Sequence, residues 1–209
     1  KLLIENCWIQ DWMNEGVAAS GRDTVFIENT VSIGNQKGFE AGYGNPIMII
    51  NHCLAMNNVD GFRLGDNYST PNEGRMIITN SIAYNNEQNI KNFTNHLGGP
   101  LPNGIEVSFS ITNEESYDNI ETNVTGVPVF KDSTYRTHYS SIGASIGTKG
   151  KNIGIIDPSV MKYGPLVINE ILYKPSSNYD SKDWVELYNP SNDSINISSW
   201  VLKDDDNDH

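Results

Sequence analysis

Five stretches of this chain align with one another, and this repetition limits the folds open to the chain more than any other feature. They span residues 2–9, 25–32, 48–55, 76–83 and 105–112. One turn position in each stretch is separated from the next by 23, 23, 28 and 29 residues, and it is occupied by Asn6, Asn29, His52, Asn80 and Phe109. Such a period is typical of a solenoid, whose repeats bury their apolar faces only by stacking on one another.

Apolar residues alternate with other residues inside each stretch, which indicates strands rather than helices. Three aligned columns are apolar: Leu2, Val25, Met48, Met76 and Ile105; Ile4, Ile27, Ile50, Ile78 and Val107; and Trp8, Val31, Leu54, Ile82 and Ile111. Asn and Gly separate the strands, and no helical pattern lies between them. The chain is therefore predicted to be all-β, with a parallel β-helix whose coils lie about 4.8 Å apart.

The turn residues lead to three further predictions. The stacked Asn column should form amide hydrogen bonds along the coils, with His52 as a structural imidazole in the same column. A second turn position should need a positive φ, and Gly16, Gly38, Gly61 and Asn89 are predicted to supply it. The two cysteines share a column two coils apart, about 9.6 Å. A disulfide requires Cα atoms within about 7 Å, so two free thiols are predicted.

Changes in the strand pattern and in the positions of Pro and Gly divide the chain into three parts. Residues 1–150 are predicted to hold the last coils and the C-terminal cap of the solenoid, and residues 151–165 a linker with Pro158, Gly164 and Pro165. Residues 166–209 show the antiparallel pattern of a partial sandwich, with strands in 166–173, 183–189 and 195–203. Because Lys1 stands beside a strand, we expect a fragment of a longer chain with further domains.

The negative net charge of the chain excludes some classes of binding partner. The net charge is −12 and the sequence pI is about 4.6, which argues against nucleic acid and anionic membranes as partners. No apolar run approaches the length of a membrane span.

Two neighbouring columns carry the charged residues, and each has two interpretations. The first holds Ala18, Glu40, Arg63 and Lys91. Arg63 would act as the base of a β-elimination, with Lys91 lowering its proton affinity; alternatively, Glu40 and Arg63 form an ion pair on a solvated face. The second column holds Glu15, Lys37, Asp60 and Gln88, and forms either a charge ladder or a calcium site.

Three aromatic residues fall in turns or loops, where they would either stack on sugar faces or pack partly in the core: Trp12, Tyr43 and Tyr68. We assign Arg63 as the candidate catalytic residue. The candidate substrate-binding residues are Lys91, Glu40, Tyr43 and Tyr68, and no metal ligand is assigned.

The C-terminal segment resembles the lamin-tail domain, an immunoglobulin-like sandwich. The residues that carry the resemblance are 167–171, 183–190 and 197–204, three spaced motifs in the same order. Such domains in secreted bacterial proteins are accessory modules, so the resemblance implies no reaction.

Residues 1–150 resemble the right-handed parallel β-helices of pectate-lyase-like proteins, and most closely those of family 9 polysaccharide lyases. The resemblance rests on residues 60–65 and 80–86. It implies that the position of Arg63 holds the catalytic base, which is a lysine in that family. It also implies a Ca²⁺ site in an aspartate cluster, whose nearest equivalent here is residues 14–16 with one carboxylate. The cofactor is therefore left open, with Ca²⁺ as the candidate.

Two functions of different classes follow. The first is an extracellular β-helix that binds or presents a polysaccharide or cell-surface polymer without catalysis, as a scaffold or adhesin. The alternative is a lyase that cleaves uronate polysaccharides by β-elimination. Both place the protein outside the cell or on its surface, in a bacterium, and this location rests on the resemblance.

Overall fold

The computed structural model describes residues 2–65, 74–93, 104–118, 120, 122–156, 167–172, 184–189 and 197–198. The chain divides into two compact units, Lys1–Met161 and Lys162–His209, which are described separately. The boundary between the two units falls inside the segment 151–165 that was predicted to be a linker.

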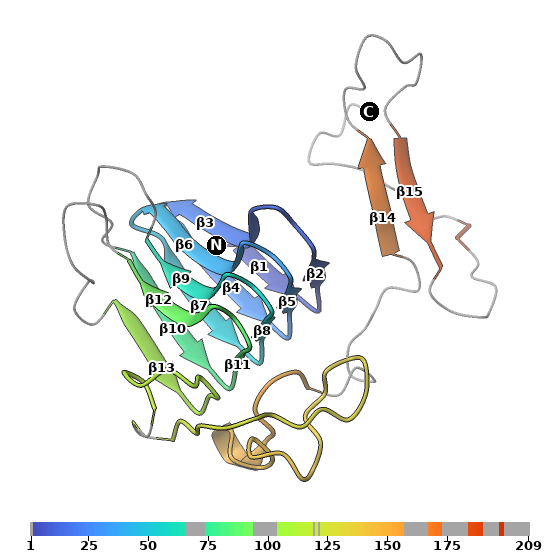
Figure 1. The fold of residues 1–209 in the computed structure, drawn as a ribbon. Helices are drawn as coiled ribbons and strands as arrows, with labels where there is room; N and C mark the ends of the chain where they lie inside the picture. Colours follow the sequence, from blue (N-terminus) through green and yellow to red (C-terminus); the bar gives the residue numbers. More distant parts are fainter. Residues whose placement is uncertain are drawn as a thin grey trace. The chain divides into compact units, whose positions relative to one another are not determined.

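The first unit is a parallel β-helix in which each of the first four coils contributes one strand to each of three sheets, and the next coil adds β13 to the first sheet (Figure 1). The first sheet contains β1 (Leu2–Glu5), β4 (Thr24–Glu28), β7 (Ile47–Asn51), β10 (Arg75–Thr79) and β13 (Ile105–Ser108). The second contains β2 (Trp8–Gln10), β5 (Val31–Ile33), β8 (Leu54–Met56) and β11 (Ile82–Tyr84). The third contains β3 (Glu15–Gly21), β6 (Lys37–Gly44), β9 (Asp60–Leu64) and β12 (Gln88–Asn92). The predicted all-β fold is confirmed.

Strand pairing confirms the apolar columns residue by residue. Leu2 pairs with Val25 and Ile4 with Ile27, and the same registers continue through β7, β10 and β13. The side chains of these columns fill the inside of the coils, and Phe39 stacks on Phe62 with ring centroids 5.2 Å apart. Leu2 and Trp8 are the exceptions, because both lie in the first coil, and they are 54% and 42% exposed.

The first turn column has the predicted left-handed backbone but only part of the predicted amide ladder. Asn6, Asn29, His52, Asn80 and Phe109 all have φ between 49° and 57°. Asn29 donates to Oδ1 of Asn6 at 2.7 Å, as predicted. Asn80 instead donates to the neighbouring Asn51 at 2.8 Å, because His52 occupies the place of an amide in the intervening coil.

Residues 147–156 run along this turn column and take up its remaining hydrogen bonds. The backbone N–H groups of Thr148 and Ile156 donate to Oδ1 of Asn80 and Asn29 at 2.8 and 3.0 Å. Nδ1 of the buried His52 donates to the Gly154 carbonyl at 3.1 Å, which confirms the structural imidazole. Ile153 and Ile155 are buried beside Ile82 and Ile111. The start of the predicted linker therefore packs on the β-helix.

The prediction for the second turn position was wrong. The positive φ values belong to Asp11, Gly34, Asn57 and Asn85, at 55° to 69°, four or five residues before the glycines that we assigned. Gly38 is needed for space instead. A Cβ atom there would lie 2.5 Å from the carbonyl oxygen of Gly61 and 2.9 Å from Nδ2 of Asn58.

Both cysteines are free thiols, as predicted. Burial raises the pKa of the Cys53 thiol to about 12, so it is protonated and unreactive at neutral pH.

The second unit contributes two antiparallel strands, β14 (Val167–Leu172) and β15 (Trp184–Tyr188), with a register shift between Ile168 and Glu170. The predicted third strand, 195–203, lies almost wholly outside the described residues. Across the described parts of both units, no helix has the length and apolar character that a membrane span requires.

Candidate functional site

The two predicted charge columns come together on the third sheet. Glu40 pairs with Ala18 and Arg63, and Arg63 pairs with Lys91. Lys37 lies between Glu15 and Asp60 in the second column. Glu40 and Arg63 each follow a core phenylalanine, so they point out of the core, because successive side chains of a strand alternate between its faces.

Six side chains of these columns form one continuous chain of ion pairs, which we call the charge network. The contacts are Glu15–Lys37 at 2.6 Å, Lys37–Glu40 at 3.0 Å, Glu40–Arg63 at 3.4 Å, Arg63–Asp60 at 2.8 Å and Asp60–Lys91 at 3.1 Å. Among the described residues, three carboxylates of the network balance three cations.

The middle of the charge network is buried and its ends are more exposed. The side chains of Glu40 and Asp60 are each 3% exposed and that of Arg63 is 7% exposed, whereas that of Lys91 is 30% exposed. The Glu40–Arg63 ion pair is thus present, but it is buried and does not lie on a solvated face. Burying unpaired charges is costly, so this pairing keeps the site stable.

Titration of the exposed end follows from these contacts. Burial acts to raise the pKa of Glu15, but its contacts with Lys37 outweigh burial and hold that pKa below its ordinary value. Burial acts to lower the pKa of Lys37, and its contacts with Glu15 and Glu40 outweigh that effect and raise it. Both groups therefore keep their charges at neutral pH.

The arrangement around Arg63 suits a structural cation better than a catalytic base. Its guanidinium donates to Asp60 at 2.8 Å and its Nε to the carbonyl of Gly65 at 3.0 Å, and it lies 5.1 Å from the ring centre of Phe93. A base needs a lone pair facing the substrate, and a guanidinium that donates to carboxylates offers none. Lys91 lies beside Arg63 in the same column, as predicted, and its ammonium donates to Oδ1 of Asp60 at 3.1 Å.

The predicted sugar-binding aromatic residues have different surroundings. Tyr43 is half exposed and lines a groove of about 580 Å³ together with Glu15 and Glu40. Tyr68 lies outside the described residues. Trp12 is 64% exposed, so it is available to a ligand rather than packed in the core.

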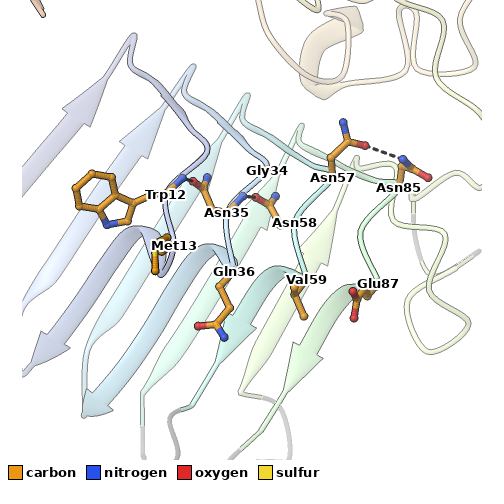
Figure 2. A pocket seen from close by; sticks show the side chains of 10 residues that line it. All are labelled: Trp12, Met13, Gly34, Asn35, Gln36, Asn57, Asn58, Val59, Asn85 and Glu87. Carbon is orange, nitrogen blue, oxygen red and sulfur yellow. Dashed lines mark hydrogen bonds between the residues drawn. The ribbon is translucent and has the colours of Figure 1, made fainter.

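Trp12 stands at one end of a second pocket, of about 510 Å³, which we call the turn pocket (Figure 2). It follows the turn between the second and third sheets through four successive coils. Besides Trp12, it is lined by Met13, Gly34, Asn35, Gln36, Asn57, Asn58, Val59, Asn85 and Glu87. Gln36, Val59 and Glu87 are exposed and repeat at one position of successive coils.

An asparagine ladder that we did not predict makes the floor of the turn pocket. Oδ1 of Asn35 accepts from the backbone N–H of Trp12 at 2.7 Å, and Asn58 and Asn86 accept in the same way from Asn35 and Asn58, at 2.8 and 2.9 Å. Asn57 also accepts from Nδ2 of Asn85 at 2.6 Å. The signal was present in the sequence, because Asn35, Asn58 and Asn86 are 23 and 28 residues apart, like the first turn column.

Within the described residues, no group of three or more His, Cys, Asp and Glu side chains is placed to hold a metal ion. Glu15 and Asp60, the two carboxylates of the predicted calcium column, are separated by Lys37. Of the two interpretations of this column, a charge ladder and a calcium site, the arrangement matches the charge ladder. The candidate Ca²⁺ cofactor stays a prediction.

Comparison with known proteins identifies one part of the chain. Residues 159–209 match the family model described as Lamin Tail Domain. This confirms the predicted resemblance for the C-terminal segment and gives it an immunoglobulin-like fold. The match covers 51 of the 209 residues. Neither the curated proteins nor the solved structures compared with the chain gave a match.

Proposed function

We propose that this β-helix is of the pectate-lyase-like type, and that the chain binds or presents an extended polysaccharide outside a bacterial cell without cleaving it. The turn pocket carries the proposal. It offers an exposed indole and exposed amide and carboxylate side chains, and its lining extends along four coils about 4.8 Å apart. A linear polymer presents its own repeating groups along such a row.

The chemistry of the turn pocket fits a neutral sugar chain. The face of an indole is an apolar platform for the C–H groups of a sugar ring, and its edge stays hydrated. The side chains of Gln36 and Asn85 supply amide groups that donate to and accept from hydroxyls. Glu87 accepts hydrogen bonds from hydroxyls at the opposite end from Trp12.

Replacing Trp12 with Ala should weaken binding of neutral polysaccharides about tenfold, which corresponds to about 1.4 kcal/mol of lost stacking. Affinity electrophoresis in gels containing xyloglucan, galactomannan or hydroxyethyl cellulose measures the retardation. The fold should survive, because Asn35 binds the backbone of Trp12 and not its ring. Tyr188→Ala is the control, since it removes an exposed aromatic ring from the other unit. Equal retardation of Trp12→Ala and the unchanged protein in every gel would contradict the proposal.

The alternative function, a uronate lyase, has one observation in its favour. Arg63 and Lys91 are neighbours in one column, and the groove with Tyr43 lies on the same sheet and shares Glu40 with the charge network. A lyase needs cations of this kind to neutralise the carboxylate of its substrate.

We expect no unsaturated product on polygalacturonate, alginate or chondroitin, with or without Ca²⁺, because Arg63 is buried and paired. Ultraviolet absorbance of the product measures the reaction. Arg63→Lys installs the residue that the resembling lyases use, and it keeps a cation in the charge network. Turnover by the unchanged protein that Arg63→Lys retains and Arg63→Ala abolishes would establish the lyase instead, provided that circular dichroism shows both variants folded.

A further inference from the structure

A basic pocket of about 750 Å³ lies in the cap of the β-helix, and none of its described lining residues belongs to the charge network or the turn pocket. Two segments form it. The first is a hairpin in which Phe130 pairs antiparallel with Thr137, and the second is the strap of residues 147–156, which pairs with the hairpin through Arg136 and Ile155. The lining residues used below are Lys131, Arg136, His138, Tyr139, Lys151 and Ile155.

The charge of the basic pocket is opposite to that of the chain. Lys131, Arg136 and Lys151 are three of 14 basic residues in a chain with 26 acidic ones, and no carboxylate is among the lining residues that the structure describes. Asp132 pairs with Arg136 from outside the lining and balances one of these charges. Lys131 and Lys151 are exposed, and neither is in an ion pair with a described residue.

The other pockets described above make the contrast clear. The turn pocket contains Glu87, and the groove at Tyr43 contains Glu15 and Glu40. Neither has a lysine or arginine among its described lining residues. The glutamates of the groove at Tyr43 are paired with Lys37 and Arg63, whereas Lys131 and Lys151 carry charges that no ion pair with a described residue balances. An anion approaching this acidic chain is therefore attracted most at the basic pocket.

The remaining lining suits a ring that carries the anion. Tyr139 is 85% exposed and its ring centre lies 4.0 Å from that of His138, so the two rings offer a platform. The backbone N–H of Ser140 donates to Nδ1 of His138 at 3.2 Å. In the neutral imidazole the proton then lies on Nε2, which becomes a donor. Ile155 gives an apolar floor.

The basic pocket is held in shape by the β-helix. Tyr135 in the hairpin stacks on Trp8 at 5.6 Å and packs edge-on against Phe130 at 5.2 Å. The strap is fixed to Asn29, His52 and Asn80 by the hydrogen bonds described above. A site that is already ordered loses little entropy when a ligand binds.

We propose that the basic pocket binds an anionic sugar, through its carboxylate or sulfate group at Lys131 and Lys151 and through its ring at Tyr139. This inference deepens the proposed function, on which it rests, by assigning a charged class of saccharide to a second site on the same unit.

The test compares two variants with the same loss of charge. Lys131→Gln/Lys151→Gln removes two cations from the basic pocket, and Arg22→Gln/Lys149→Gln removes two exposed cations that do not line it. Binding of polygalacturonate, dextran sulfate and neutral dextran is measured by titration calorimetry at two salt concentrations. The first two probes separate a carboxylate from a sulfate ligand.

We expect the unchanged protein to bind at least one anionic probe, with weaker binding at high salt. Any binding of neutral dextran should not change with salt or in the pocket variant. The pocket variant should lose at least tenfold in affinity, and the control variant less than twofold. Equal losses in both variants, or no binding of either anionic probe, would overturn the inference. The effect of Trp12→Ala on neutral polysaccharides tests the proposed function separately, so the two failures are distinguishable.

Discussion

Asp60→Asn should destabilise the β-helix by about 3–5 kcal/mol, the usual cost of removing one partner from a buried ion pair. The carboxylate of Asp60 binds both Arg63, at 2.8 Å, and Lys91, at 3.1 Å, and its side chain is only 3% exposed. Asparagine has nearly the same shape, so the change removes charge and little packing. It leaves the network with an excess positive charge in a buried place.

The stability of this unit is best measured apart from that of the second unit. Amide hydrogen exchange of β6 and β9 reports the free energy of opening these strands alone. Glu106→Gln is the matched control, because the Arg75–Glu106 pair also joins neighbouring coils but both side chains are 49% exposed. Such a pair contributes about 0–1 kcal/mol.

A double variant then tests whether the loss comes from the unbalanced charge. Asp60→Asn combined with Arg63→Gln should cost clearly less than the sum of the two single changes, because the pair is removed together. A cost of Asp60→Asn no larger than that of Glu106→Gln would show that the network is not stabilising. Additive costs would show that Asp60 acts through contacts other than its charge.

The repeat alone was enough to predict the architecture. Columns such as Leu2, Val25 and Met48 came out in register because a strand that slips by one residue turns its apolar side chains to the wrong face. The pairing of Glu40 with Arg63 followed from the same register. The register, read from the repeat, therefore predicted which charged side chains are neighbours on the third sheet.

Burial and turn geometry could not be predicted from the repeat. A column of charged residues in a strand pattern is usually solvated, so the burial of Glu40 and Arg63 was not expected. The glycines were assigned to a positive φ because that is their commonest role in turns. The role of Gly38 depends on the approach of a neighbouring coil, which local sequence does not record. Lys131 and Lys151 line one pocket because segments outside the repeat pack together, and the repeat does not predict that packing.

Gly38→Ala should destabilise the β-helix by about 2–3 kcal/mol, although an alanine is ordinary in a strand. The new methyl group would lie 2.5 Å from the backbone oxygen of Gly61 and 2.9 Å from Nδ2 of Asn58. Overpacking against backbone costs about 1–3 kcal/mol. Nδ2 of Asn58 also donates to the Ser32 carbonyl at 3.1 Å, and displacing it loses about 1 kcal/mol more.

The fourth coil supports this requirement for glycine, because it has a different residue at the same position. Asn89 stands where the earlier coils have Gly16, Gly38 and Gly61, and its strand β12 is the end of the third sheet as described. Among the described residues, no further strand of this sheet stacks on β12, so Asn89 keeps a side chain, and its Oδ1 accepts from Nδ2 of Asn86 at 2.9 Å. Glycine thus stands at the three positions where the backbone of the next strand lies against the added Cβ.

Gly42→Ala is the matched control, since Gly42 lies in the same strand, β6, and the nearest atoms to its added Cβ are those of Glu40 at 3.4 Å, an ordinary contact. It should leave stability unchanged or slightly higher, because alanine restricts the unfolded chain. Hydrogen exchange of β6 and β9 in the two variants gives the comparison. Equal stability of Gly38→Ala and Gly42→Ala would mean that the coils separate easily at this turn, and that close stacking does not require the glycine.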